Sequence, residues 1–213
     1  MFENLQGFFE STLGQVVTIG IIAIFFLLIL MPTKNQKNKR ADTKAVTLSA
    51  LMVALATGLG MLKLFEMPYG GTVTFFSMLP IVLCGYFLGT RRGVMAGMCV
   101  GLLNLIFGPY VIHPVQLLVD YPFAFGALGL SGICAKQKNG LFKGYLVGLL
   151  GRYVCAVISG IVFFGAYAPE GFNAVTWSLF YNFTYLAAEG ALTLVIISIP
   201  PVKKALEGLK SQL

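Results

Sequence analysis

Seven stretches of this sequence are apolar over most of the length that a helix needs to cross a lipid bilayer, which is about 20 residues. They run Gly14 to Met31, Ala45 to Phe65, Val73 to Leu88, Val94 to Phe107, Val115 to Ile133, Gly144 to Ala166 and Ala174 to Ile199. Hydrophobic residues make up 57% of the chain and charged residues only 11%, unlike a soluble domain. Because apolar and polar residues do not alternate with period two, we predict an all-α integral membrane protein rather than a barrel.

The basic residues lie at every second boundary between these predicted spans, and short cytoplasmic loops collect Lys and Arg. They form four groups: Lys34, Lys37, Lys39, Arg40 and Lys44; Arg91 and Arg92; Lys136, Lys138 and Lys143; and Lys203, Lys204 and Lys210. Among charged residues, the opposite boundaries carry Glu3, Glu10, Glu66 and Glu170 with Lys63. We therefore expect a multi-pass protein whose N-terminus is outside and whose C-terminus is cytoplasmic. The net charge of +7 indicates orientation in the bilayer rather than nucleic-acid binding.

The first apolar stretch is interpreted as a retained helix rather than a signal peptide. Acidic residues precede it, no small-residue cleavage site follows, and the next loop is basic. The segment from Pro32 to Lys44 is polar enough to be a flexible linker. We expect residues 1–44 to form an extra N-terminal transmembrane helix with a basic cytoplasmic linker. Residues 45–213 are expected to form a six-helix membrane domain.

Three ionisable residues, Asp120, Arg152 and Glu189, fall inside the predicted spans. Placing each one there costs about 2.5 to 3.5 kcal/mol on insertion scales, so such residues usually have a function. Arg152 and Glu189 lie at similar depths toward the cytoplasmic side, and we interpret them as a structural ion pair. That interpretation leaves Asp120 without a protein cation. Its alternative partners are Asn182 or a tyrosine hydroxyl.

Asp120 belongs to a polar and aromatic cluster in the outer half of the predicted membrane domain. At 1.5 Å per helical residue, Asp120 is about 9 Å from the outer boundary at Pro114, and Asn182 is about 13 Å from the one at Asn173. Gln116 precedes Asp120 by four positions and shares its helix face. Trp177 lies above Asn182, and the aromatic residues nearby are Tyr121, Tyr181 and Tyr185. A carboxylate among aromatic rings suits a small organic cation.

Several kinds of chemistry find no motif in this sequence. It contains no G-x-x-x-x-G-K-[ST] loop for nucleotide hydrolysis, no H-E-x-x-H and no G-x-S-x-G. The cysteines, Cys84, Cys99, Cys134 and Cys155, form no C-x-x-C pair, and His113 is the one histidine, so we expect no metal site or disulfide framework. We therefore expect no enzymatic activity and no cofactor. If transport here uses ATP, another subunit must hydrolyse it.

Small residues follow one face of the second predicted helix. They are Ser49, Ala50, Ala54 and Gly58. Small side chains let two helices approach closely. Two interpretations stay open, packing within the chain and docking of another membrane protein.

Two separated blocks of sequence resemble the signature of the thiamine-binding substrate subunits of energy-coupling factor (ECF) transporters. The first block runs from Gly160 through Phe164 to Gly171 and continues from Trp177 through Tyr181 to Asn182. The second runs from Tyr110 through Gln116 to Asp120 and Tyr121. The resemblance covers the chain from about Ala45 to its end, and the first helix lies outside it.

This resemblance implies a six-helix fold in the bacterial cell membrane with a vitamin pocket near the outer face. It also implies a transmembrane coupling partner and two cytoplasmic ATPases, with Ala50 and Ala54 matching the small-residue docking motif. Asp120 stands where the family has an acid that meets the aminopyrimidine ring, and Asn182 matches a hydrogen-bonding Asn. Tyr110 matches a pocket tyrosine. Trp177 occupies a position often filled by Tyr, and Phe164 one where Trp stacks on the thiazolium ring.

Two positions depart from the family pattern. Ala156 stands where some members have a pyrimidine-binding His, and Ser77 where some have Glu near the thiazolium. These departures extend the expected ligands from thiamine to its pyrimidine precursor. Two other functions remain as alternatives, a proton-coupled carrier that acts alone through Asp120 or Glu189, and a structural membrane subunit.

Overall fold

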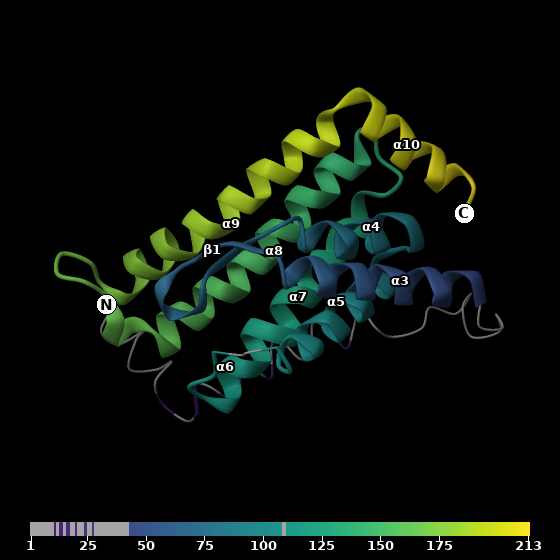
Figure 1. The fold of residues 1–213 in the computed structure, drawn as a ribbon. Coiled ribbons are helices and arrows are strands. Elements are labelled where there is room, and N and C mark those ends of the chain that lie inside the picture. The colour runs from purple at the N-terminus through teal and green to yellow at the C-terminus, as the bar shows by residue number, and fades with distance from the viewer. Residues whose placement is uncertain are drawn as a thin grey trace.

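A computed structural model describes residues 43–107 and 110–213, with single positions at 11, 13, 14, 16, 17, 20, 24 and 27. These residues form a helical bundle that carries one small hairpin (Figure 1). The predicted first span, Gly14 to Met31, and its linker fall almost wholly outside the described residues. The division at residue 44 therefore stays a prediction.

The first half of the bundle contains α3 (Thr43–Gly60), the strands β1 (Lys63–Glu66) and β2 (Thr72–Thr74), α4 (Met78–Leu88) and α5 (Thr90–Asn104). A helical run with three changes of type follows, made of α6 (Pro114–Leu118), the π-helical turn η3 (Val119–Phe123), α7 (Ala124–Leu128) and the 3-10 segment η4 (Gly129–Cys134). We call residues 114–134 the broken run. The chain ends with α8 (Gly140–Phe163), the short turn η5 (Gly165–Tyr167), α9 (Ala174–Ser198) and α10 (Pro200–Ser211).

Four of the described helical segments are long and apolar enough to cross a membrane: α3, the broken run, α8 and α9. The all-α membrane fold predicted from the sequence is thus confirmed. Helix α4, with 11 residues, is only about 16 Å long at 1.5 Å per residue. That length is about half of the hydrocarbon core, so the polypeptide before α4 must supply the rest of this crossing.

The two predicted spans on either side of residues 66–72 are wrong at their facing ends. Instead of continuing as helix, β1 and β2 pair as antiparallel strands, with Glu66 opposite Thr72. Between them the chain reverses at Tyr69 and Gly70, whose φ angles are 67° and 93°. Pro68 precedes this left-handed pair and suits such a turn, because its ring fixes φ. The hairpin replaces the end of one predicted helix and the start of the next.

Helix α10 was expected only as a cytoplasmic tail, and it folds back across the end of the bundle. Lys203 Nζ donates to Asn139 Oδ1 at 3.0 Å. Lys210 Nζ donates to the carbonyl of Ala135 and lies 3.5 Å from the ring centre of Tyr86. Lys44 Nζ reaches the Gln212 carbonyl at 2.9 Å. These contacts gather the start of α3, the start of α8 and the C-terminus at one end of the molecule.

Glycines let α5 and α8 clamp the broken run backbone to backbone. On α5, a Cβ added to Gly97 would overlap the carbonyl of Phe125. On α8, Cβ atoms at Gly144 and Gly148 would lie 2.6 Å from the carbonyl oxygens of Ser131 and Leu128. No other residue type allows this separation, because any Cβ would push the segments apart.

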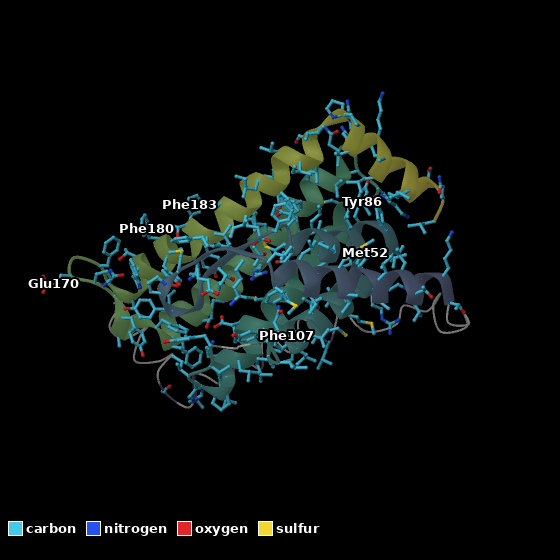
Figure 2. The ribbon with its side chains drawn as sticks, in the orientation of Figure 1. Met52, Tyr86, Phe107, Glu170, Phe180 and Phe183 are labelled. Atoms are coloured by element: carbon cyan, nitrogen blue, oxygen red, sulfur yellow. The ribbon has the colours of Figure 1, made fainter. Side chains whose placement is uncertain are left out.

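The outer faces of α3 and α9 are covered by no described part of the chain. Phe180 and Phe183 point away from the bundle on α9 (Figure 2) and are 55% and 60% exposed, as expected of side chains that meet lipid. On α3, Ala50 and Ala54 are exposed, and a Cβ at Gly58 would meet nothing within 4 Å. Ser49 lies elsewhere, since its hydroxyl contacts Cys84 Sγ of α4 at 3.8 Å. The row of small residues therefore consists of 50, 54 and 58.

We predict that Gly97→Ala destabilises the protein by about 2 kcal/mol or more, because the added methyl overlaps backbone that cannot move aside. Gly58→Ala is the matched control, since it adds the same methyl to open space and improves helix propensity by up to about 1 kcal/mol. Thermal unfolding in detergent measures both. Equal unfolding temperatures for the two variants would contradict the backbone clamp.

Candidate functional site

A cavity of about 670 Å³ opens between the hairpin, the broken run, α8 and α9. Its walls come from the second half of α8 and the first half of α9, so it lies far from α10 (Figure 1). The volume falls within the roughly 300 to 1,000 Å³ typical of small-molecule sites. It begins where the glycine contacts between α8 and the broken run end.

The structure brings all the substrate-binding residues predicted from the sequence to this one cavity. They are Tyr110, Gln116, Asp120, Tyr121, Gly160, Phe164, Trp177, Tyr181 and Asn182. They come from three segments that are distant in the sequence. Their contact with a ligand stays a prediction.

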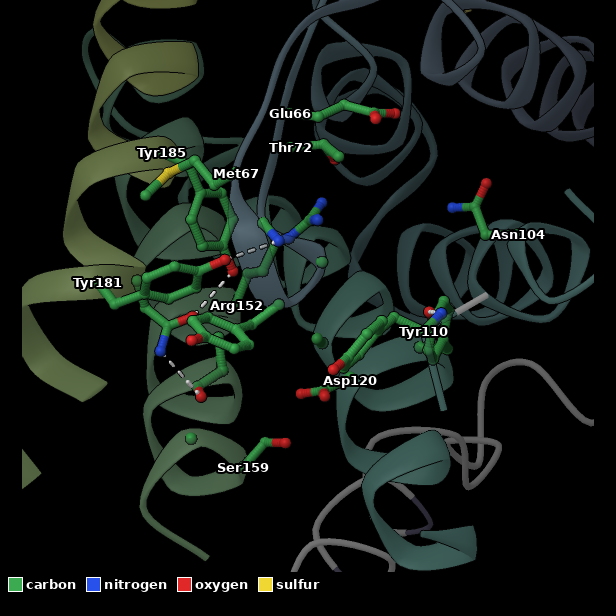
Figure 3. Close-up of a pocket in the computed structure, with 18 of the residues that line it drawn as sticks. Glu66, Met67, Thr72, Asn104, Tyr110, Asp120, Arg152, Ser159, Tyr181 and Tyr185 are labelled. Carbon is green, nitrogen blue, oxygen red and sulfur yellow. Dashed lines mark hydrogen bonds between the residues drawn. The ribbon is translucent and has the colours of Figure 1, made fainter. Parts of the chain in front are cut away.

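Asp120 is positioned by the π-helical turn and by Gln116. Pro122 lies inside this turn and cannot donate a backbone hydrogen bond, which favours a local change of helix type. Gln116 Nε2 donates to Asp120 Oδ2 at 2.6 Å and to the Tyr110 carbonyl at 3.0 Å. Gln116, only 2% exposed, is thus the partner of Asp120, in place of the predicted Asn182 or a tyrosine. The carboxylate points into the cavity, with Ser159 below it (Figure 3).

Aromatic rings form much of the remaining wall. Tyr110 stacks on Phe164 with ring centres 5.9 Å apart and an interplanar angle of 29°. Trp177 lies 5.6 Å from Tyr181, which in turn lies 5.9 Å from Tyr185. Such rings offer flat, electron-rich faces to an aromatic or cationic ligand.

Tyr181 also holds the hairpin in place. Its hydroxyl accepts a hydrogen bond from Gly71 N at 2.9 Å and donates one to the Pro68 carbonyl (Figure 3). A Cβ at residue 71 would lie 2.7 Å from this hydroxyl, so the approach requires glycine there. The tip of the hairpin is therefore fixed to α9 by one phenol.

Asn182 is 6% exposed and is largely engaged within the protein. Its Nδ2 donates to the carbonyls of Ser178 at 2.9 Å and Ala156 at 3.2 Å, and its Oδ1 accepts from Tyr185 OH at 2.9 Å. Gly160 allows this close packing of α8 and α9, because a Cβ there would overlap Ser178 Oγ. The amide oxygen retains one lone pair for a ligand.

The predicted ion pair between Arg152 and Glu189 is wrong. Glu189, 3% exposed, accepts hydrogen bonds from Thr74 N at 2.9 Å, Thr74 Oγ1 at 2.8 Å, and Met78 N and Ser77 Oγ at 3.3 Å. Arg152 instead lies over the Phe125 ring, 4.0 Å from its centre. Within the described ranges neither residue forms a salt bridge. The hairpin, which the sequence did not predict, supplies the donors that satisfy Glu189.

Arg152 faces the same cavity. Its Nη1 is buried and has no hydrogen-bond partner among the described residues. The guanidinium lies close enough to Asp120 for their charges to interact, although they form no direct salt bridge. Asp120 is therefore not without a nearby protein cation, contrary to our expectation.

Sequence reasoning missed the part of the wall that the hairpin provides. Glu66, Met67 and Tyr69 all line the cavity, and the segment had been assigned to helix ends and a loop. The signal that could have found it is the run Pro68 to Gly71, which marks a tight turn. Ser77, where the resemblance places Glu in some members, donates to Glu189, so this end of the cavity does contain a carboxylate.

Comparisons with known proteins agree on one family. The family model described as "Thiamine transporter protein" matches residues 46–207. "Thiamine transporter ThiT" of Bacillus subtilis is 34% identical, over 79% of this chain and 93% of that protein. The ThiT of Lacticaseibacillus paracasei is 31% identical, over 58% of this chain and 70% of that protein. A solved structure of ThiT from Listeria monocytogenes superposes with a TM-score of 0.63 at 22% identity, covering 76% and 97% of the two chains, and so shares the fold.

We predict that Glu189→Gln destabilises the protein by about 2 kcal/mol, because charge-assisted hydrogen bonds become neutral ones, whereas Arg152→Gln changes stability little. The double variant should equal the sum of the two within about 0.5 kcal/mol, since residues that do not contact each other act additively. Thermal unfolding of all three provides the cycle. Recovery of stability in the double variant would restore the ion pair.

Proposed function

This chain belongs to the thiamine transporter protein family, and we propose that it binds thiamine from outside the cell in the cavity between α8, α9 and the hairpin. The observation that supports this most directly is the meeting of Asp120 and Asn182 with stacked aromatic rings in one membrane-embedded cavity. The chain's relatives are named as transporters and not as enzymes. The chain would accordingly hold its ligand without changing it.

The chemistry of the cavity suits the two rings of thiamine. The amino group of the pyrimidine is a donor, and Asp120 offers an acceptor fixed from behind by Gln116. A charge-assisted hydrogen bond of this kind is strong where water is excluded. The rings of Tyr110, Phe164 and Trp177 can cover both ring faces, and a cationic thiazolium gains further from such contact. The pyrimidine precursor would fill only part of this space.

Binding can be tested through the one tryptophan of the chain, Trp177. It lines the cavity, so thiamine should quench its fluorescence, and a titration of the purified protein gives the affinity. Titration with the pyrimidine precursor decides between the two ligands. Absence of saturable binding of either compound would remove the proposed function and leave a structural subunit.

We predict that Asp120→Asn weakens thiamine binding about tenfold or more, because the amide cannot offer a charged acceptor. Glu170→Gln is the matched control, since it removes a carboxylate from the exposed loop before α9 (Figure 2). Its affinity should stay within about twofold of the parent. An unchanged affinity in Asp120→Asn would exclude this residue from the site.

Energy for uptake would come from other subunits. The sequence lacks a nucleotide-binding loop, so the proposal includes an ECF transmembrane coupling subunit and two cytoplasmic ATPases. Ala50 and Ala54 are exposed on α3, where small side chains would let a partner helix approach closely. Uptake by proteoliposomes that contain only this chain would instead favour the proton-coupled carrier.

The proposed orientation places the cavity toward the outside and α10 in the cytoplasm. Lys44, Lys203 and Lys210 all make contacts at the α10 end of the bundle, and basic residues are retained on the cytoplasmic side. Residues 1–44 would be an appended segment outside the conserved domain, since the family match begins at residue 46.

We predict that Ala54→Phe abolishes thiamine uptake in cells but leaves binding by the purified chain unchanged, because the bulky ring keeps the coupling subunit away. Leu55→Phe is the control. Leu55 is also exposed, at 45%, but points away from the row by about 100° around the helix. Uptake should persist in this variant. Uptake that survives Ala54→Phe would show that the row is not the docking face.

A further inference from the structure

The charged residues of the cavity do not balance. Of the described residues that line it, Lys63 and Arg152 are basic, and Glu66, Asp120 and Glu189 are acidic. Lys63 and Glu66 form a salt bridge of 2.5 Å, and both are substantially exposed. Arg152 interacts electrostatically with Asp120. Glu189, the most buried of the three acids, is left without a cation among the residues that the structure describes.

Building on the thiamine-binding function, we propose that Glu189 is a specificity residue whose fixed negative charge selects a ligand ring with a permanent positive charge. The cationic ring would lie at the end of the cavity formed by Thr74, Ser77 and Glu189. The single excess negative charge of the described lining matches one monovalent cation.

The hydrogen bonds of Glu189 indicate which kind of cation fits. Thr74 N and Met78 N can only donate, so both carboxylate oxygens accept, which is the pattern of an ionised carboxylate. With the hydroxyls of Thr74 and Ser77 added, its acceptor positions are filled. An ammonium group or other N–H donor would have to displace one of these bonds. A ring whose quaternary nitrogen has no N–H needs only the charge, so it suits this carboxylate.

The two buried carboxylates therefore favour different ends of one ligand. Asp120 accepts a printed hydrogen bond at Oδ2 only from Gln116, so it can accept from an amino group, whereas Glu189 attracts without a new hydrogen bond. Tyr185 lies within electrostatic range of Asp120, Arg152 and Glu189, which places its ring between the two ends. Arg152 would repel a cation, so the positive ring should lie on the Glu189 side.

The test compares thiamine with an analogue in which a neutral thiophene replaces the thiazolium ring, both titrated calorimetrically against the purified chain. The parent should prefer thiamine about tenfold or more, and Glu189→Gln should remove most of this preference while changing the affinity for the neutral analogue less than about threefold. Asp120→Asn should weaken both ligands by similar factors, because both carry the aminopyrimidine. Glu189→Asp should retain the preference, since it keeps the charge.

A second variant decides the matter if Glu189→Gln does not fold. Arg152→Gln removes the competing positive charge, so the preference for thiamine over the neutral analogue should rise by about threefold or more. Equal weakening of both ligands in Glu189→Gln, or an unchanged preference in Arg152→Gln, would show that Glu189 only anchors the hairpin. Equal affinity of the parent for both compounds would overturn this inference alone. Failure of the parent to bind either would overturn the proposed function.

Discussion

Close approach between the backbones of α5, the broken run and α8 is the constraint on which the rest of the fold depends. Lipid provides little hydrophobic force between helices, so contact area and separation determine their packing. Gly97 on α5 and Gly144 and Gly148 on α8 have no room for a Cβ. The same face of α8 continues, four residues on, with Arg152 and then Ala156. The helices can no longer touch where the arginine replaces glycine, and the cavity opens at that point.

The irregular polypeptide before α4 depends on one carboxylate. Backbone that is neither helix nor closed sheet is tolerated at membrane depth only where protein groups satisfy its polar atoms. Glu189 accepts from the backbone of Thr74 in the hairpin and of Met78 at the start of α4. Its negative charge also lies near the positive end of the α4 helix dipole. One side chain on α9 thus joins the strand to the following short helix and leaves a buried charge facing the cavity.

Sequence reasoning succeeded where helix geometry alone determines the contact and failed where tertiary structure does. Gln116 and Asp120 are four residues apart, so a helix places them together whatever surrounds them. Residues 63–66 were assigned to helix because short apolar runs look alike in strands and helices. The Arg152 and Glu189 pair had suitable depth. Its failure depends on Thr74, which lies 115 residues away from Glu189 in the chain and which reaches the carboxylate only through the hairpin.

The attachment of the hairpin to α9 separates how tightly a ligand is held from how long it stays. Tyr181 holds both sides of the turn, through Pro68 and Gly71, and these backbone atoms can be released without altering Asp120. Residence time in related complexes varies more than association rate, and here it has a structural element of its own. Changes in the turn sequence could therefore alter the turnover of uptake, by hastening or delaying release, while the equilibrium preference among ligands stays the same.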